Sequence, residues 1–405
     1  MRIWVVNHYA DPPDGLATRS FDLARRWVEK GHPTTIFTSN FSHYRLQPVR
    51  RIPPFKLWLD EYVEGVRLVW LRSPGYRLNN WRRVLNMVTF SGLAIVSGAI
   101  RRERPDAVIG VSVHPLAALA GWLLAGIKRA RFFFEVTDLW PQTLIEFGML
   151  APKSFAARSM QRLERFLFRH SERIIMLWRH TDEYVESQGV SRDRIVWIPH
   201  GVELSRYEGL VAYDGVAGKP FRVMFLGGFV SANSLETILD AAVELKRKGR
   251  DDIKLLLIGS GQDRDAIIDR SRVLRLDNVE FPPAVPKAEI SKAMALADAF
   301  IYGLRDLPLY RYGISLNKLT DYLAAGRPII FFGKSTYDPV AEARAGFSVP
   351  PGDPVAVADA IEKLSLLSPQ ERKAMGERGR DYLLGYHNIP NLAERFLGVL
   401  EAAPR

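Results

Sequence analysis

The sequence predicts two doubly wound α/β domains in tandem, and three observations support this fold class. Short apolar runs alternate with helix-length amphipathic stretches along the whole chain, as in parallel sheets with helices on both faces. The 405 residues suffice for two or three domains. The alternation lapses once, over 203–220, where three glycines and a proline occur without periodicity, and then it resumes. We therefore expect one domain on each side of this stretch, which we interpret as a linker.

The first domain is expected to span residues 1–202. Helices are expected at 17–30 and 155–170, where apolar residues recur at helical spacing. The longest apolar stretch, Val84–Ile100, is interrupted by Asn86, Thr89, Ser91 and Ser97, so we interpret it as a buried or interfacial helix rather than a membrane span. The expected strands are Ile3–Val6, Thr34–Phe37, Arg67–Leu71, Ala107–Val111, Arg131–Phe134, Arg173–Leu177 and Ile195–Ile198.

The second domain is expected to span residues 221–386 and to repeat the same alternation. After it, residues 387–405 contain a loop with His387 and Pro390 and then a final helix over Asn391–Glu401. The expected strands of the second domain are Arg222–Leu226, Lys254–Ile258, Val279–Phe281, Ala299–Tyr302, Pro328–Phe332 and Phe347–Val349.

Composition excludes several classes of protein. The chain has no cysteine, which excludes disulfide scaffolds, thiolate metal sites and a cysteine nucleophile, and which fits a reducing compartment. No G-x-G-x-x-G, H-E-x-x-H or G-x-S-x-G motif occurs, and the eight histidines show no ligand spacing. We therefore expect no nicotinamide cofactor, no metal and no serine hydrolase chemistry. The net charge of +11 favours anionic partners.

The strongest local signal for a site lies in the segment YGISLNKLTDYLAAGRP. Ser315 is expected to cap a helix that begins near Asn317 and ends before Gly326. The amino end of a helix attracts anions, Lys318 adds a positive charge for phosphate, and Asp321 suits sugar hydroxyls on the same face. The alternative is that Lys318 and Asp321 form only a surface ion pair.

The loop before this helix is also basic. Arg305 and Arg311 both lie in it, so their charges are expected near the same helix start. This favours phosphate binding over the surface ion pair.

Two carboxylates follow the expected strand in FFFEVTDLWPQT. Glu135 and Asp138 are placed where the carboxyl end of a strand meets a ligand, and either could act as a general base or orient a substrate hydroxyl. The alternatives are that Asp138 caps a helix ahead of Pro141 and that Glu135 is the buried partner of an arginine.

Glycines follow three expected strands and could let the backbone approach a ligand closely. They are Gly15 in the first loop, the pair Gly227 and Gly228, and Gly259. The two sites in the second domain together suggest a nucleotide cradle. Plain turn glycines remain the alternative at each position, and His8 in the first loop is interpreted as structural.

The region from Arg45 to Arg104 carries most of the excess charge, with 12 Lys and Arg against 4 Asp and Glu. Aromatic residues are interleaved, which suggests a surface that docks on anionic lipid headgroups. The alternative is a solvated face over core aromatics. No nucleic-acid motif occurs, so nucleic acid is not an expected partner.

Several motifs along the chain, taken together, resemble those of a known family. It is similar to the glycosyltransferase family 4 proteins with the GT-B fold, in particular to the bacterial O-antigen and capsule branch that includes N-acetyl-fucosaminyl-type transferases. The resemblance is carried, in order along nearly the whole chain, by FEVTDLWPQT (134–143), VWIPHGVE (196–203), VMFLGGF (223–229), LLLIGSG (255–261) and GISLNKLTDYLAAGRP (313–328).

The resemblance implies two Rossmann-like domains facing a cleft and a reaction that retains anomeric configuration without a metal. It implies a nucleotide-sugar donor, expected to be a UDP-sugar, held mainly by the second domain, and an acceptor held mainly by the first. It also implies that residues 387–405 pack back on the first domain. Asp321 falls at the second acidic position of the E-x7-E motif, which in the family holds the donor ribose.

Two departures from the family pattern stand out. Gly313 replaces the first acidic residue of that motif, and no basic residue follows the strand of VMFLGG before Lys246, where many relatives use Arg and Lys to grip the diphosphate. The phosphates would then depend on Lys318, on Arg305 or Arg311, and on the helix start near Ser315.

The sequence therefore predicts a glycosyltransferase of surface polysaccharide synthesis. The expected partners are a nucleotide-sugar, a polyprenyl-diphosphate-linked or saccharide acceptor, and the anionic inner face of the cytoplasmic membrane, at which a cytoplasmic, peripheral protein would act. Asp138, Glu135 and Lys318 are the expected catalytic residues. Two alternatives remain, an enzyme like UDP-GlcNAc 2-epimerase and a catalytically silent nucleotide-sugar-binding module.

Overall fold

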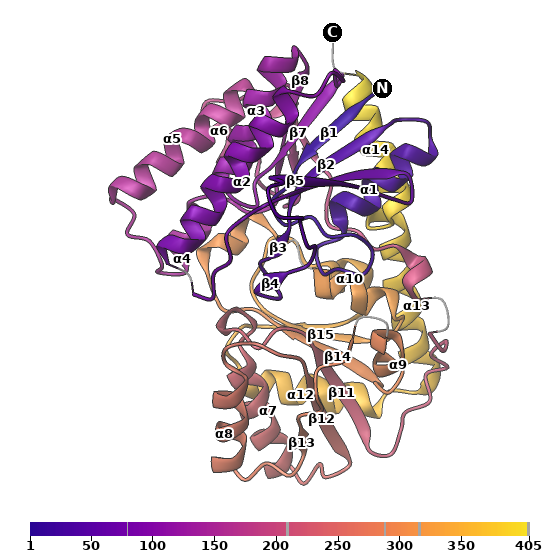
Figure 1. Cartoon of the computed structure of the whole chain (residues 1–405). Coiled ribbons are helices and arrows are strands. Elements are labelled where there is room, and N and C mark those ends of the chain that lie inside the picture. Colours follow the sequence, from indigo (N-terminus) through magenta and orange to yellow (C-terminus); the bar gives the residue numbers. More distant parts are fainter. Residues whose placement is uncertain (79, 208–209, 287–288, 315–316, 403–405) are drawn as a thin grey trace. The chain divides into compact units, whose positions relative to one another are not determined.

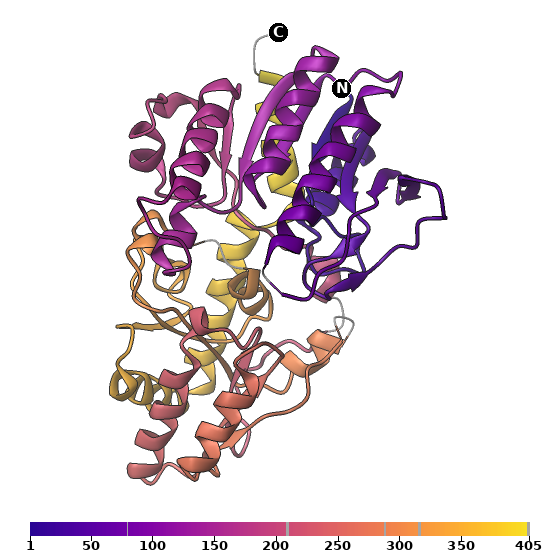
Figure 2. The ribbon, with the colours of Figure 1, turned by 60° about the vertical axis from the view of Figure 1, so that its left-hand side comes forward.

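The structure, a computed structural model, describes residues 1–405 except 79, 208–209, 287–288, 315–316 and 403–405. Its contacts divide the chain into two compact units. Unit 1 comprises Met1–Pro199 and Ile389–Arg405, and unit 2 comprises His200–Asn388. Each unit has a mainly parallel sheet with helices on both faces, so the predicted fold class is confirmed (Figures 1 and 2).

In its described part, unit 1 is built on an eight-stranded sheet with the order β10-β9-β8-β7-β1-β2-β6-β5. Neighbouring strands are parallel except that β5 runs antiparallel to β6. The strands are β1 (Ile3–Val6), β2 (Thr34–Ser39), β5 (Trp58–Val63), β6 (Val66–Leu71), β7 (Ala107–Val111), β8 (Arg131–Val136), β9 (Ile174–Met176) and β10 (Ile195–Trp197), with β3 (Phe41–Ser42) and β4 (Gln47–Pro48) in a separate ribbon.

The helices of unit 1 cover both faces of this sheet. One face carries α1 (Arg19–Glu29) and α14 (Ile389–Ala402), and the other carries α2 (Trp81–Ala99), α3 (Pro115–Lys128) and α5 (Phe155–His170) (Figure 1). Shorter helices are α4 (Gln142–Glu146), α6 (Asp182–Glu186) and η1 (Arg192–Arg194).

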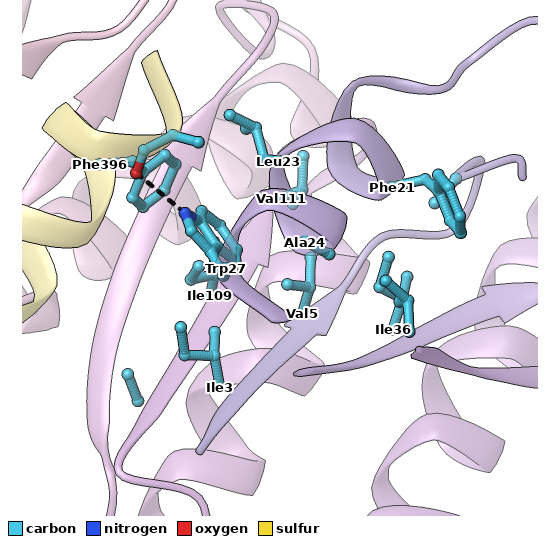
Figure 3. Packing of buried hydrophobic residues seen from close by; sticks show 14 of the residues in the cluster. Ile3, Val5, Phe21, Leu23, Ala24, Trp27, Ile36, Ile109, Val111 and Phe396 are labelled. Carbon is cyan, nitrogen blue, oxygen red and sulfur yellow. Dashed lines mark hydrogen bonds between the residues drawn. The ribbon is translucent and has the colours of Figure 1, made fainter. Parts of the chain in front are cut away.

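The C-terminal helix α14 completes the core of unit 1. The Trp27 indole N–H on α1 donates to the Ala393 carbonyl at 3.0 Å, and its ring meets Phe396 edge-on at 5.2 Å (Figure 3). Phe396 is fully buried with Ile3 and Ile109 in one apolar cluster. Burial of such a ring stabilises by roughly 2–3 kcal/mol, so α14 belongs to this fold energetically as well as spatially.

Unit 2 has, in its described part, a six-stranded parallel sheet with the order β13-β12-β11-β14-β15-β16. The strands are β11 (Phe221–Leu226), β12 (Ile253–Ile258), β13 (Val279–Glu280), β14 (Ala299–Gly303), β15 (Ile329–Phe332) and β16 (Gly346–Val349). Its helices are η2 (Leu204–Tyr207), η3 (Ser231–Asn233), α7 (Leu235–Arg247), α8 (Arg264–Val273), α9 (Ile290–Met294), η5 (Pro308–Tyr312), α10 (Asn317–Ala324), α11 (Pro339–Ala343), α12 (Pro354–Leu366) and α13 (Pro369–Tyr386).

Much of the stretch interpreted as a linker is fastened to unit 2. The Gly215 carbonyl accepts a hydrogen bond from the buried Arg372 at 2.9 Å, and the Gly218 N–H donates to Asp298 at 2.8 Å. Side chains of unit 2 thus satisfy backbone groups that a helix or strand would otherwise satisfy.

No helix in the described part of the chain combines the length and the sustained hydrophobicity that a bilayer span requires. Helix α2, which covers the longest apolar stretch, has 19 residues and buries Asn86, Ser91 and Ser97.

Each sheet changes its direction of winding at one point, between β1 and β7 in unit 1 and between β11 and β14 in unit 2. Ligands of open α/β sheets bind at the carboxyl ends of the strands at such switch points. The residues that follow these four strands therefore define where each unit could bind a ligand.

In unit 1 the switch point holds two buried histidines. His8 follows β1, His114 follows β7, and His8 Nδ1 lies 2.6 Å from His114 Nε2. The Ala117 N–H donates to His114 Nδ1 at 3.2 Å, so the proton of a neutral His114 sits on Nε2 and points to His8. His8 also stacks on Phe90 of α2 at 4.1 Å. The pair thus joins two strands and a helix.

Both histidines are held neutral. Burial lowers the pKa of His114 to about 3, with the positive charge of Arg83 adding to the effect. Burial, followed by the neighbouring His114, likewise lowers the pKa of His8 well below 6.5. A group whose folded pKa is depressed stabilises the fold above its unfolded pKa and loses that contribution as pH falls.

We predict that the protein loses stability as pH falls from 6.5 towards 3, by up to about 1.4 kcal/mol per pH unit for each histidine of the pair. His114→Asn keeps a side chain that can cap the Ala117 N–H but removes one titrating group, so its stability should fall less steeply. Urea unfolding at a series of pH values measures both slopes. The exposed His170→Asn is the control and should keep the wild-type slope; an equal slope in His114→Asn would contradict the prediction.

Candidate active site

Lys318 lies at the switch point of unit 2. It is the second residue of α10, and its Nζ is 5.4 Å from the centre of the Phe225 ring and 5.8 Å from that of Tyr302. Phe225 belongs to β11 and Tyr302 to β14, the two strands between which the sheet changes direction. The ammonium group therefore occupies the position where an open α/β sheet binds its ligand.

Gly227 makes room for this lysine. A Cβ added at Gly227 would lie 2.2 Å from Lys318 Cε and 3.0 Å from Nζ, whereas one at Gly228 would have no neighbour closer than 3.9 Å. Gly227 follows β11 directly, so a side chain there would displace the ammonium. The glycine pair and the lysine, which are separate signals in the sequence, form one arrangement.

The charge of Lys318 has no carboxylate partner within 4 Å in the described part of the chain. Burial lowers its pKa to about 8, and the negative charge of Asp321 opposes the shift. At neutral pH the group remains mostly protonated, although burying an ammonium without a paired anion is unfavourable. An anionic ligand would relieve this cost.

Helix α10 is fixed to the end of β11 by Tyr322. The Tyr322 hydroxyl accepts the Leu226 N–H at 2.8 Å and lies 3.1 Å from the Leu226 carbonyl. Its ring stacks on Phe300 of β14 at 4.4 Å. These contacts hold the first turn of α10, and with it Lys318, beside the turn that begins at Gly227.

Asp321 lies on the next turn of α10, and its carboxylate is held by a residue that sequence reasoning missed. The Tyr207 hydroxyl donates to Asp321 Oδ1 at 2.5 Å. Tyr207 lies more than a hundred residues earlier, at the end of η2, in a stretch without periodicity, so no local pattern pointed to it.

Gly259 is adjacent to Gly227. A Cβ at Gly259 would lie 1.8 Å from the Gly227 carbonyl oxygen, and its φ of +147° favours glycine. The Gly227 N–H donates to Ile258 at 2.9 Å. The turns after β11 and β12 therefore need glycine because they lie against each other, and a direct contact of Gly259 with the donor stays a prediction.

The two predicted loop arginines are placed differently. Arg305 is exposed just after β14, whereas Arg311 lies on η5 and donates to the Tyr312 hydroxyl at 2.7 Å, with its guanidinium 4.7 Å from that ring. Ser315 lies outside the described residues, as does the side chain of Asn317. Their predicted parts in donor binding stay predictions.

Gly313, the departure from the family motif, has a backbone reason. Its φ is +97° and its ψ is −167°, a conformation that is strained for any residue with a side chain. A glutamate here would require a different path between η5 and α10.

In unit 1 the backbone N–H groups of the loop after β1 already bind a carboxylate of the same loop, where an external anion could otherwise bind. Asp11 Oδ2 accepts the N–H groups of Leu16 and Ala17 at 2.9 and 3.1 Å. A Cβ at Gly15 would lie 2.1 Å from Asp11 Cβ. Gly15 thus has a structural reason to be glycine, and its predicted contact with the donor stays a prediction.

Glu135 pairs with an arginine. Its Oε1 accepts Arg19 Nε at 2.8 Å, and Arg19 also donates to the carbonyls of Ile198 and Pro199. Both side chains of the ion pair are largely buried. This geometry supports the alternative interpretation, a structural partner, over the catalytic role expected for Glu135.

Asp138 lies in a loop that its neighbours hold in place. The Thr137 N–H donates to the Ser112 hydroxyl at 3.0 Å, and the Trp178 indole donates to the Thr137 carbonyl at 3.0 Å. Burial raises the pKa of Asp138 to about 6, opposed by the Thr137 side chain. A carboxyl group with a pKa near neutrality after a strand of a parallel sheet suits a role in handling protons or hydroxyls. In the described part of the chain no three His, Asp or Glu side chains gather as a metal site would require.

Two family models match the chain in series. The glycosyl transferase 4-like domain matches residues 14–201, and the glycosyl transferases group 1 domain matches residues 220–366. The first model thus covers unit 1 from residue 14 to Pro199 and the first two residues of unit 2. The second model falls within unit 2.

Among curated proteins, the putative colanic acid biosynthesis glycosyl transferase WcaI of Escherichia coli is 20% identical over 338 residues, 79% of this chain and 80% of its own. The probable glycosyltransferase WbjE of Pseudomonas aeruginosa is 22% identical over 301 residues, 70% of this chain and 73% of its own.

Solved structures share the fold. Sucrose-phosphate synthase from Thermosynechococcus elongatus has a TM-score of 0.75 at 17% identity, over 99% of this chain and 98% of that one. Anabaena HepE, solved in complex with UDP, has 0.66 at 12% (99% of each chain), and WaaG, a glycosyltransferase involved in lipopolysaccharide biosynthesis, has 0.68 at 15% (99% and 100%). With both of its units matched by glycosyltransferase models and its fold shared with these enzymes, the chain belongs to the glycosyltransferases of the GT-B type.

Proposed function

We propose that this protein is a retaining, metal-independent glycosyltransferase that moves a hexosyl or N-acetylhexosaminyl group from a UDP-sugar to a hydroxyl of a lipid-linked or saccharide acceptor. The observation that carries the proposal is the partly buried ammonium of Lys318 at the switch point of unit 2, beside Gly227, where a side chain would displace it.

The donor diphosphate matches this position in charge. The first turn of a helix has N–H groups that make no bond within the helix, and here Lys318 adds a full positive charge to them. Because negative charge grows on the diphosphate as the sugar departs, a fixed ammonium stabilises the transition state more than the bound donor. The Anabaena HepE structure contains UDP, which supports the choice of a uridine donor.

Asp138 is assigned to hydroxyl positioning. In a retaining transfer the departing diphosphate can itself take the acceptor proton, so a strong side-chain base is not required. Above pH 6 the Asp138 carboxylate is ionised and accepts a substrate hydroxyl more strongly than the acid would.

A part in bacterial surface polysaccharide synthesis is supported by the relatives. WcaI is assigned to colanic acid biosynthesis, and WaaG is involved in lipopolysaccharide biosynthesis. In its most specific form, the proposal is that the protein transfers an N-acetyl-fucosaminyl-like sugar, as members of the O-antigen and capsule branch do.

The outward face of α2 supports the proposals that the acceptor is lipid-linked and that the protein binds a membrane surface. Trp81, Val84 and Val88 on this helix are 66%, 56% and 52% exposed and recur at helical spacing. Arg77 and Arg82 are exposed beside them, and the Arg82 guanidinium lies 5.6 Å from the Trp81 ring. Apolar side chains with flanking arginines suit the interface of an anionic leaflet. We assign this face to the inner leaflet of the cytoplasmic membrane.

We predict that Lys318→Ala weakens UDP binding about tenfold or more, because a charge-assisted contact to phosphate is lost. Gly227→Ala should weaken it similarly by displacing the ammonium. Titration calorimetry with UDP measures both.

The double variant provides the control. Once Lys318 is alanine, the added methyl group at residue 227 no longer meets the lysine, so Gly227→Ala/Lys318→Ala should bind UDP as Lys318→Ala does. No loss in Lys318→Ala would show that the lysine does not hold the phosphates, and fully additive losses would show that Gly227 acts independently of the lysine.

We predict that Asp138→Asn lowers kcat by about 100-fold or more while the UDP dissociation constant stays the same. In the wild type kcat should rise with pH through about 6, as the carboxylate forms, and this rise should disappear in the variant. Sugar transfer followed by mass spectrometry measures both. The exposed Asp193→Asn is the control; unchanged turnover in Asp138→Asn would remove the residue from the reaction.

We predict that the wild type floats with vesicles containing phosphatidylglycerol more than with neutral ones, and that Trp81→Ser/Val84→Ser/Val88→Ser reduces this at least tenfold. Val273→Ser, an 81% exposed apolar residue on α8 of unit 2, is the matched control and should float as the wild type does. Equal flotation of the wild type on neutral and anionic vesicles would contradict the membrane assignment.

A further inference from the structure

The phenol of Tyr207 is placed firmly although it lies outside the main helices and strands. Tyr207 ends η2, whose turn is closed by a hydrogen bond from the Arg206 N–H to the Glu203 carbonyl at 3.1 Å. The Ser291 hydroxyl of α9 donates to the Arg206 carbonyl at 3.2 Å. The segment that presents Tyr207 is thus fastened to unit 2 at the residue just before it.

The Tyr207 hydroxyl is a donor to Asp321 at any physiological pH. Burial, and next the negative charge of Asp321, raise the pKa of Tyr207 well above its ordinary value. The contact to Oδ1 is short, at 2.5 Å, and joins a phenol to a carboxylate. A residue outside α10 therefore helps to set the orientation of the Asp321 carboxylate.

This contact changes what Asp321 can do for a ligand. A carboxylate can accept both hydroxyls of a vicinal diol, and here one of its oxygens also accepts the phenol. The phenol oxygen itself keeps acceptor capacity, because a hydroxyl that donates one bond can still accept others. Tyr207 and Asp321 together thus present two neighbouring acceptor oxygens, one on each residue.

The pair also lies close to the phosphate site. Asp321 follows Lys318 by one turn of α10, and its charge acts on the Lys318 ammonium. A ligand whose phosphates reach Lys318 would bring its sugar towards Asp321.

We propose that Tyr207 is a specificity-determining residue for the donor nucleotide: its phenol fixes the Asp321 carboxylate, and the two side chains together recognise the vicinal diol of a ribonucleoside diphosphate. The inference rests on the proposed function, because it takes the phosphates of that nucleotide to lie at Lys318.

The test compares UDP with 2′,3′-dideoxy-UDP, which lacks both ribose hydroxyls, by titration calorimetry. The wild type should prefer UDP about tenfold or more. Tyr207→Phe removes only the hydroxyl and should bind UDP about five- to tenfold more weakly, with little change towards the dideoxy analogue. Asp321→Asn should also lose most of the preference.

Tyr213→Phe is the matched control. Tyr213 lies in the same irregular segment, with its ring 5.3 Å from the Arg327 guanidinium, and its hydroxyl has no hydrogen-bond partner among the described residues. This variant should keep the wild-type preference. Urea unfolding shows whether each variant is folded at the temperature of the titration.

The outcomes separate this inference from the proposed function. An intact preference for UDP in Tyr207→Phe, or an equal loss for both nucleotides, overturns the inference. If Lys318→Ala binds UDP normally while Tyr207→Phe loses the preference, the role of Tyr207 stands and the phosphate assignment fails. If the wild type binds UDP and its dideoxy analogue equally, the inference is overturned even where Lys318→Ala weakens both.

Discussion

The arrangement of unit 2 depends on one constraint, a partly buried lysine ammonium that has no carboxylate within 4 Å in the described part of the chain. In the described part of the chain, the residues around Lys318 supply two aromatic faces, a glycine turn and a helix start, and the nearby charge of Asp321 only partly offsets the cost of burial. Ring faces attract a cation, but by only about 1–2 kcal/mol. An anion bound at this position would recover the remaining cost, and this is why we propose it as a binding site.

Comparison of the two units shows how similar sheets acquire different chemistry. Both change winding direction beside their first strand, yet the residues that follow this strand differ. In unit 1 the loop after β1 bonds its own Asp11 carboxylate, and a neutral histidine pair fills the switch point. In unit 2 the corresponding loop begins with Gly227 and faces a cation. The structure therefore supports the binding of an external anion in unit 2. In unit 1 the corresponding N–H groups are already bonded to the carboxylate of Asp11.

Much of the fold was predictable because it depends on local patterns. Every strand expected from the sequence is present, with ends shifted by at most two residues. The strand β5 was missed because its residues are only partly buried at a sheet edge and its apolar pattern is weak. Its hairpin turn, Glu64-Gly65, has φ of +47° and +79°, as in the tight turns that join antiparallel strands, and this pair was the available signal.

The site was predictable only in part, because its members come from distant segments. Lys318, Asp321 and the glycines were found as separate motifs, but sequence alone did not show that Gly227 is glycine because of Lys318. Tyr207 could not be inferred, since its role depends on a contact across more than a hundred residues. For Glu135 the sequence left two interpretations open, and only the placement of Arg19 distinguishes them.

The proposed function depends on the ammonium of Lys318 receiving the diphosphate of the donor. A crystal structure of the protein with UDP tests it most directly. We predict diphosphate oxygens within about 3 Å of Lys318 Nζ, beside the turn at Gly227 and the first turn of α10. Clear density for UDP with its phosphates elsewhere, and with Lys318 still lying over Phe225 and Tyr302 without an anion, would contradict it.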